Sequence, residues 1–164
     1  MGLGIQGVHH IGISVPDIDN ARHFYIDLLG AVEEVAPLEW RDNRFIDAIV
    51  GLKDSAARQF ICRLGNTQLE VFEYAQPRSA PQDPDQGVHT FGYTHFALQV
   101  DDVAACAERL KAAGIRLHCE PDLSTIVTHP DGRKTGYAAT YCRDWFGNVF
   151  EIMEIHDSGD MKRV

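Results

Sequence analysis

Two histidines and two pairs of glutamates stand at matching places in the two halves of this sequence. His10 opens the segment HIGISVPDIDNARHFYIDLLGA, and His95 opens HFALQVDDVAACAERLKAAGI. Near the end of each half, at residues 69–74 and 150–155, the chain repeats the order apolar, Glu, apolar, apolar, Glu, apolar. Imidazole and carboxylate groups are common ligands of divalent metals in proteins, so metal binding is the first chemistry that this set suggests.

An internal repeat of structural elements explains the matching positions. Each half begins with a short alternating strand, followed by an aspartate suited to a helix N-cap, Asp17 or Asp102, and an amphipathic helix. Each helix closes near a glycine, Gly30 or Gly114, as a C-terminal cap requires. The pattern predicts an α+β fold of two tandem βαβββ modules, forming a curved mixed sheet with helices outside and a trough inside.

The predicted modules cover residues 6–74 and 92–156, joined by a linker at 75–91 that is rich in Pro, Gly, Asp and Gln. Together they make a single domain over residues 1–156, followed by a C-terminal tail at 157–164. Further strands are expected around residues 31–37, 45–52 and 58–64 in the first half and around 115–120, 123–128 and 137–143 in the second.

Strand alternation predicts which histidines face the trough. His10 shares a face with the small residues Gly12 and Ser14, opposite an apolar face that should pack against the helix. His95 likewise lies opposite the apolar face of its own strand. Both histidines should therefore point into the trough, whereas His9 should be in phase with the helix-facing residues.

The glutamates are less certain from alternation alone. Glu70 and Glu73 lie on opposite faces of one closing strand, and Glu151 and Glu154 lie on opposite faces of the other. Carboxylates inside apolar runs are depleted unless they are paired or bind a metal. Strand phase does not decide which pair faces the trough, and an exposed edge or a salt bridge is expected for the other pair.

Four motifs taken in order resemble those of the vicinal oxygen chelate superfamily, which includes glyoxalase I, methylmalonyl-CoA epimerase, extradiol dioxygenases and fosfomycin-resistance proteins. The motifs are HHIGISV, TQLEVFEY, YTHFALQV and FGNVFEIMEI, and the resemblance extends over about residues 6–156. It implies that one divalent metal is bound by His10, Glu70, His95 and Glu151, without choosing among Zn, Ni, Co, Mn and Fe(II). No other cofactor is implied.

The same resemblance implies a metal-dependent lyase or isomerase of the glyoxalase or epimerase kind. A chelated substrate carbonyl would be polarised, and Glu151 or Glu70 would move its α-proton. One alternative is a single-domain extradiol-type Fe(II) dioxygenase, and another is a non-catalytic small-molecule binding or resistance protein. The resemblance also implies a homodimer.

The bulk composition narrows the classes of partner. A formal net charge of −9 argues against nucleic acid and against an anionic membrane surface, which leaves a small-molecule substrate. No run of about 18 apolar residues or signal peptide is present, and the four cysteines form no CxxC pair. We therefore expect a cytoplasmic protein with reduced thiols.

Three further features could contribute to a site. Arg44, on or before an expected strand, could bind a substrate carboxylate, although an exposed arginine is the simpler interpretation. The segment 121–136, which contains His129, could act as a lid. Trp145 and Phe146 could line a pocket mouth or pack against the fold.

Overall fold

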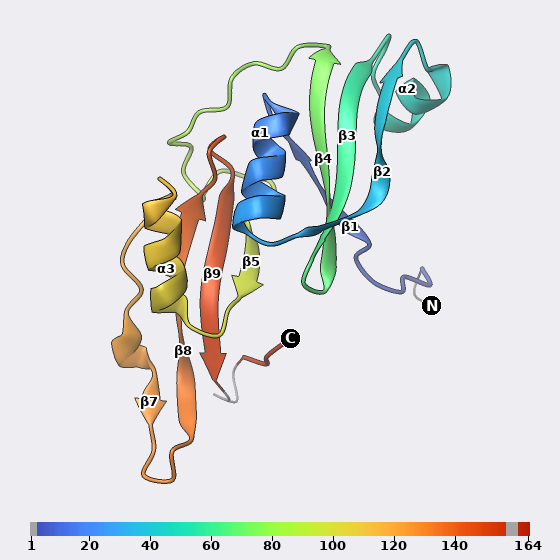
Figure 1. Cartoon of the computed structure of the whole chain (residues 1–164). Coiled ribbons are helices and arrows are strands. Elements are labelled where there is room, and N and C mark those ends of the chain that lie inside the picture. Colours follow the sequence, from blue (N-terminus) through green and yellow to red (C-terminus); the bar gives the residue numbers. More distant parts are fainter. Residues whose placement is uncertain (1–2, 157–160) are drawn as a thin grey trace. The chain divides into compact units, whose positions relative to one another are not determined.

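The computed structural model describes residues 3–156 and 161–164; residues 1–2 and part of the expected tail, 157–160, lie outside the described residues. The chain divides into two compact units, Met1–Pro81 and Gln82–Val164. Each unit combines a β-sheet with helices, so the fold is α+β as predicted (Figure 1). Within the described ranges, no helix has the length and apolar character needed to cross a membrane.

The first unit has a four-stranded sheet in the order β1-β4-β3-β2. Strand β1 runs parallel to β4, and the other neighbours are antiparallel. In chain order, its elements are β1 (His10–Ser14), α1 (Ile18–Arg22), a π-helical continuation (His23–Leu28), β2 (Val32–Arg41), α2 (Arg44–Val50), β3 (Ala56–Leu64) and β4 (Thr67–Gln76).

The second unit repeats this arrangement with the order β5-β9-β8-β6. Strand β5 is parallel to β9, as β1 is to β4, and the short strand β7 pairs with β8. In chain order, its elements are β5 (Phe96–Gln99), α3 (Val103–Ala112), β6 (Arg116–Leu117), a 3-10 turn (Leu123–Thr125), β7 (Val127–Thr128), β8 (Lys134–Arg143) and β9 (Val149–His156).

The predicted helix ends are confirmed in both units. The Asp17 side chain accepts hydrogen bonds from the backbone N–H groups of the first turn of α1, and Asp102 caps α3 in the same way. Gly30 and Gly114 both have a φ of +78°, the left-handed conformation that glycine adopts without a steric penalty. Helix α1 contacts β4, and α3 contacts β9 (Figure 1).

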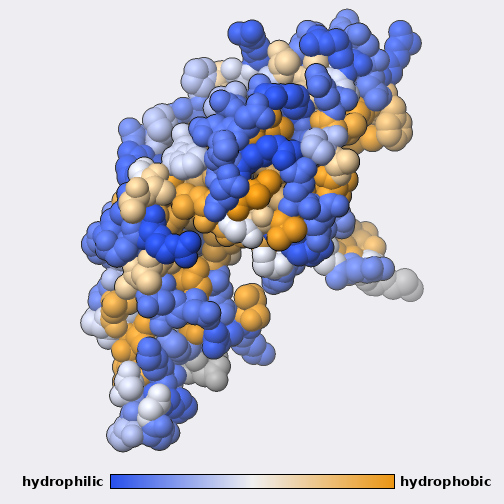
Figure 2. Space-filling model, in the orientation of Figure 1, coloured by the Kyte–Doolittle hydropathy of each residue, from blue (hydrophilic) through white to orange (hydrophobic). Residues whose placement is uncertain are grey.

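The strand expected at residues 45–52 is wrong, because Arg44–Val50 forms helix α2. The Asn43 side chain caps this helix by accepting from the N–H groups of the first turn, and Gly51, at a φ of +69°, ends it. Its apolar side chains Phe45 and Ile49 are exposed at 75% and 68%, and Figure 2 shows hydrophobic atoms on the surface over this helix. The apolar run that suggested a strand is therefore an exposed helix face.

The strand expected at residues 123–128 is also largely wrong. A 3-10 turn occupies its first half, and only Val127–Thr128 pairs with β8. Thr125 donates a hydrogen bond from its hydroxyl to the carbonyl oxygen of Tyr137, and His129 Nε2 lies 2.8 Å from Thr135 Oγ1. The segment considered as a lid is thus a hydrogen-bonded extension of β8.

Each unit has one buried cysteine at the same position of its sheet. Cys62 on β3 lies opposite Leu69, and Cys142 on β8 lies opposite Phe150, at equivalent positions of the two sheets. Both thiols are fully buried. Burial raises the pKa of Cys62 to about 11 and that of Cys142 to about 12, so both remain protonated at neutral pH. All four cysteines are free thiols, as expected.

Candidate functional site

In the first unit, the parallel strands β1 and β4 bring His10 and Glu70 together. Gly12 is the register partner of Glu70, and His10 lies two residues before Gly12, on the same face of β1. Nε2 of His10 lies 3.0 Å from Oε2 of Glu70, and the two side chains are 39% and 19% exposed. Exposure alternates along β1, and His10 lies on the more exposed face, opposite Ile11 and Ile13.

In the second unit, His95 and Glu151 form the equivalent pair. Ala97 is the register partner of Glu151, as Gly12 is of Glu70. Nε2 of His95 lies 3.3 Å from Oε2 of Glu151, with side-chain exposures of 25% and 17%. The repeat therefore reproduces the pairing of the same two atom types, in addition to the residue types.

The geometry of each pair fits two ligands of one small cation. Metal–nitrogen and metal–oxygen bonds of about 2.1 Å place two adjacent ligand atoms about 3.0–3.4 Å apart at angles between octahedral and tetrahedral. The 3.0 Å and 3.3 Å separations lie in this range. Among residues 3–156 and 161–164, no three His, Cys, Asp or Glu side chains form a group able to hold a metal, so each unit by itself supplies two candidate ligands.

The second ring nitrogen of each histidine contacts the residue just before it in the chain. Nδ1 of His10 lies 2.9 Å from Nδ1 of His9, and Nδ1 of His95 lies 2.9 Å from Oγ1 of Thr94. A hydrogen bond donated from Nδ1 leaves the lone pair on Nε2, which is the nitrogen that faces the glutamate in both units. His9 is exposed, and its imidazole contacts that of His10 edge to face.

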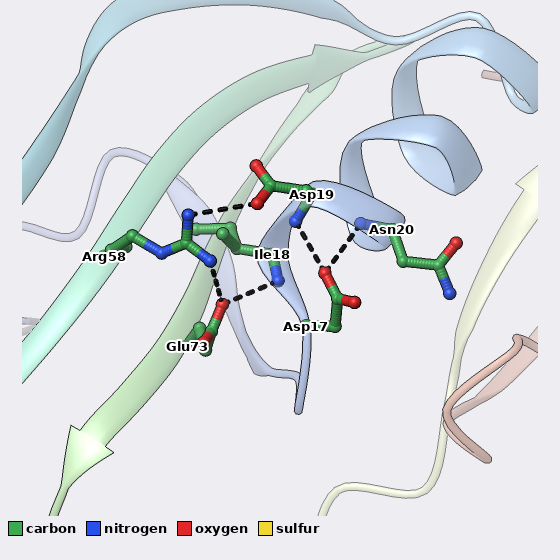
Figure 3. Close-up of polar contacts among 6 residues, drawn as sticks. All are labelled: Asp17, Ile18, Asp19, Asn20, Arg58 and Glu73. Carbon is green, nitrogen blue, oxygen red and sulfur yellow. Dashed lines mark hydrogen bonds and ion pairs between the residues drawn. The ribbon is translucent and has the colours of Figure 1, made fainter.

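The other two glutamates hold the helices in place. Oε2 of Glu73 accepts from the backbone N–H of Ile18 at 2.9 Å and from Nη2 of Arg58 at 2.7 Å (Figure 3). Oε2 of Glu154 accepts from the N–H of Val103 at 3.0 Å. Both carboxylates thus bind the first turn of a helix from the opposite face of the strand to Glu70 and Glu151.

From the sequence, an exposed edge or a salt bridge was expected for these two glutamates, and each carboxylate has an ionisable partner. Glu73 does form an ion pair with Arg58. Glu154 is only 6% exposed and so lies at no exposed edge, but its Oε1 lies 2.7 Å from Nε2 of His156, which makes the salt bridge of the expectation when that histidine is protonated. Neither expectation included the helix N-terminus as the partner of the carboxylate.

The side chains that contact the two His–Glu pairs differ between the units, and they were not predicted from the sequence. In the first, Nε2 of Gln59 on β3 donates to Oε1 of Glu70 at 2.7 Å. In the second, the ring of Tyr141 on β8 lies against His95, with 4.4 Å between ring centroids. The ring of His118 also contacts Tyr141, and burial, assisted by the charges of nearby arginines, lowers the pKa of His118 and favours its neutral form.

An aromatic cluster lies beyond Glu70 on the first sheet. Trp40, Phe72 and Tyr74 contact one another, with centroid separations of 5.7–6.1 Å. Phe72 and Tyr74 follow Glu70 at two-residue intervals and so lie on the same face of β4. Burial together with the Glu70 charge raises the pKa of Tyr74. A protonated phenol and apolar rings therefore border the first pair.

Helix α2 supports this cluster through one hydrogen-bonded chain. Trp40 donates from Nε1 to Oγ of Ser55 at 2.9 Å, and Ser55 donates to Oδ1 of Asp47. The hydrogen bonds from Ser55 lower the pKa of Asp47. Asp47 falls in the segment 45–52 that was expected to be a strand; it instead ties α2 to the start of β3, and Arg44 is exposed at the first turn of the helix.

Trp145 connects the turn between β8 and β9 to helix α3 through a hydrogen bond. Its Nε1 donates to the carbonyl oxygen of Ala113, at the C-terminal end of α3, with a distance of 3.2 Å. The adjoining turn is held by Asp144, which accepts from the N–H groups of Phe146 and Asn148. This turn joins β8 to β9 and so fixes the register of the strand that carries Glu151.

Comparison with known proteins agrees with the repeat and the fold. A family model described as the glyoxalase/bleomycin resistance protein/dioxygenase superfamily matches residues 9–132. A 2-epi-5-epi-valiolone epimerase from an Actinomyces species is 34% identical over 94% of this chain and 84% of its own length. Mouse mitochondrial methylmalonyl-CoA epimerase is 29% identical over 66% of this chain, and the match spans about half of that protein, 54%.

Solved structures show the same fold at low sequence identity. A glyoxalase family protein from Bacillus cereus has a TM-score of 0.76 at 18% identity, over 93% of this chain and 95% of its own. The fosfomycin resistance protein FosX of Listeria monocytogenes, solved with Mn(II) and sulfate, has a TM-score of 0.55 at 19% identity, over 92% and 93%.

Proposed function

Because the chain belongs to the glyoxalase/bleomycin resistance protein/dioxygenase superfamily, we propose that it is a metal-dependent isomerase of the epimerase kind. Its curated relatives, including the Actinomyces and mouse proteins, are epimerases. The observation that carries the proposal is the repeated pair, His10 with Glu70 and His95 with Glu151, whose Nε2 and Oε2 atoms are spaced as two ligands of one ion. Isomerisation, rather than the lyase reaction also expected from the sequence, is favoured by these relatives.

The proposed ligands are His10, Glu70, His95 and Glu151, holding one divalent ion. Two neutral imidazoles and two carboxylates balance the charge of such an ion and suit Zn, Ni, Co, Mn or Fe(II). When bound, the ion would supply Lewis-acid polarisation of a substrate carbonyl and thereby make its α-proton acidic. The contacts at Nδ1 of both histidines favour Nε2 as the ligating atom.

The proton transfer falls to a carboxylate of this set, Glu151 or Glu70. An epimerase removes a proton from one face of a carbon and delivers one to the opposite face, so one of the two carboxylates would serve as the general base and the other as the general acid, with the roles exchanged in the reverse reaction. Both carboxylates are partly exposed, at 17% and 19%, and are therefore accessible to a small molecule. The apolar cluster beside Glu70 would exclude water from one side of the transfer.

Two substrate types follow from the relatives. The wider match to the Actinomyces protein favours a compound of the 2-epi-5-epi-valiolone type. An acyl-CoA, suggested by the methylmalonyl-CoA epimerases, is the second choice because that match spans a smaller share of both chains. The net charge of −9 also gives little general attraction for the phosphates of CoA.

Solvent deuterium exchange tests the proposal. The purified chain, loaded with each of the five metals in turn, is incubated in D₂O with 2-epi-5-epi-valiolone and with methylmalonyl-CoA, and incorporation at the α-carbon is followed by mass spectrometry. We expect metal-dependent incorporation with at least one substrate and its loss in Glu151→Gln or Glu70→Gln. Tight substrate binding without exchange by any metal-loaded form would contradict an epimerase and favour a binding protein.

A further inference from the structure

We propose that Gln59 is a positioning residue for Glu70 that confines this carboxylate to ligation through a single oxygen, Oε2. The inference rests on the proposed metal set. It starts from one contact: Nε2 of Gln59 donates to Oε1 of Glu70 at 2.7 Å, while Oε2 of the same carboxylate faces Nε2 of His10 at 3.0 Å. The two oxygens of Glu70 therefore have different partners.

The register of the sheet explains how Gln59 reaches Glu70. Strand β3 is antiparallel to β4, with Ile61 opposite Glu70 and Gln59 opposite Phe72. Gln59 and Glu70 are diagonal neighbours on one face, a spacing of about 7–8 Å that only long side chains bridge. The amide must present its N–H to the carboxylate, since the opposite orientation would place two oxygens in contact. This hydrogen bond to a charged group is of the stronger kind.

The second unit lacks this contact at the equivalent position. Ala139 lies opposite Met153 on β9, as Gln59 lies opposite Phe72 on β4, and alanine has no donor to offer Glu151. The aromatic ring of Tyr141 supports His95 instead. The strand beside the closing strand thus contacts different members of the pair in the two repeats: β3 contacts the carboxylate in the first, and β8 contacts the imidazole in the second.

The consequence for metal binding follows from the fork geometry of a carboxylate. A carboxylate with both oxygens free can bind an ion through one oxygen or two and can rotate between these modes. With Oε1 held by Gln59, rotation into a two-oxygen mode would cost this hydrogen bond, so ligation through Oε2 is favoured, in the orientation that already faces His10. Residues that orient a metal ligand in this way contribute about 10- to 100-fold to metal affinity.

The experiment measures metal affinity rather than turnover. Gln59→Met keeps the length of the side chain and removes the donor, and Gln59→Leu is a second donor-free variant. Gln68→Met is the matched control, because Gln68 is a glutamine on the same face of β4 whose amide contacts Glu34, 3.3 Å away, instead of Glu70. Titration calorimetry with Mn(II), and the visible spectrum of the Co(II) form, are recorded for each variant.

We expect about 10- to 100-fold weaker Mn(II) binding in both Gln59 variants and a changed Co(II) spectrum, with Gln68→Met close to the unsubstituted protein. Melting of the metal-free forms should be similar for all, which separates positioning from folding. Unchanged affinity and spectrum in the Gln59 variants, with normal metal binding by the unsubstituted protein, would overturn this role alone. Absence of metal binding by the unsubstituted protein would overturn the ligand set and, with it, the role of Gln59.

Discussion

The carboxylate of Glu154 accepts a hydrogen bond from the backbone N–H of Val103, 3.0 Å away in the first turn of α3. Glu73 makes the equivalent contact with Ile18 at 2.9 Å. These contacts connect the last strand of each unit to its helix on the face opposite the proposed ligands, so Glu73 and Glu154 have a structural role that Glu70 and Glu151 do not share.

We therefore predict that Glu154→Gln lowers stability and leaves metal binding intact. The amide keeps an acceptor oxygen but loses the charge beside the helix N-terminus, so the free energy of unfolding should fall by about 1 kcal/mol. Urea denaturation and metal analysis check both parts, with Glu73→Gln as the equivalent change in the first unit. Loss of stoichiometric metal in either variant would move the ligand assignment to that glutamate.

His10→Ala and Glu151→Ala should each abolish stoichiometric metal binding, because the first removes the proposed ligand atom Nε2 and the second removes the proposed ligand atom Oε2. His9→Ala should still bind one ion, with affinity lower by about 10-fold or less, since exposed His9 contacts only Nδ1 of His10. Equilibrium dialysis followed by elemental analysis measures the stoichiometry. Equal loss of metal in His9→Ala and His10→Ala would show that the strand phase is assigned wrongly.

Asp47 should contribute to acid resistance. Its pKa is lowered in the folded state by the hydrogen bonds from Ser55, so the folded protein binds the proton less readily than the unfolded chain. This contribution is fully present above the ordinary value of 3.8 and is lost as pH falls below it toward the folded pKa. Asp47→Asn should be less stable than the unsubstituted protein at neutral pH, and the difference should shrink in that acidic range, measured by thermal melting. A pH-independent difference would contradict this.

Three of the four cysteines should react with alkylating reagents in two groups. Cys119 is exposed and should be labelled in the native protein, whereas Cys62 and Cys142 are buried, with pKa values of about 11 and 12. Because thiolate is the reactive form, both buried thiols should be labelled only after unfolding in denaturant. Mass spectrometry of peptides after timed alkylation at neutral pH measures this, and fast native labelling of Cys142 would contradict the burial.

We further predict a homodimer, as the family resemblance implies, because a sheet with an unpaired edge is stabilised when a second subunit covers it. Light scattering at micromolar concentration checks the mass, and a monomeric mass would contradict the prediction.

A dimer containing one His10→Ala chain and one His95→Ala chain then distinguishes two arrangements. If each metal set comes from a single chain, this heterodimer has no intact set; if the sets combine units from two chains, one set remains intact. We favour single-chain sets, and metal content of the purified heterodimer decides between them.

The repeat and the phase of its histidines were predictable because they depend on local periodicity. Alternation in the first strand is enough to place His10, and a capping aspartate with a closing glycine is enough to place a helix. The same local signals failed at α2, where an apolar run resembles a strand. There, the Asn43 cap and the hydrogen bonds between Asp47 and Ser55 stabilise a helix. The bonds to Ser55 form only when the chain after α2 folds back against the helix.

Gln59 could not be assigned from the sequence for a different reason. Its contact with Glu70 depends on the register between β3 and β4, which the turn at Gly65, with a φ of +60°, helps to set. A shift by one residue would turn Gln59 to the opposite face. Periodicity predicts that two side chains share a face, but not that a long one crosses diagonally to its neighbour.

Strands β4 and β9 each carry a proposed ligand and a helix-binding glutamate, three positions apart and on opposite faces. An insertion or deletion of one residue early in either strand would move both carboxylates to the opposite faces of the strand. The proposed ligand and the contact with the helix would then be lost together. Diverging copies of the module can therefore change length only outside these strands. The two units differ in this way: the first has α2 between β2 and β3, the second has the β7 extension before β8, and their closing strands have the same spacing of glutamates.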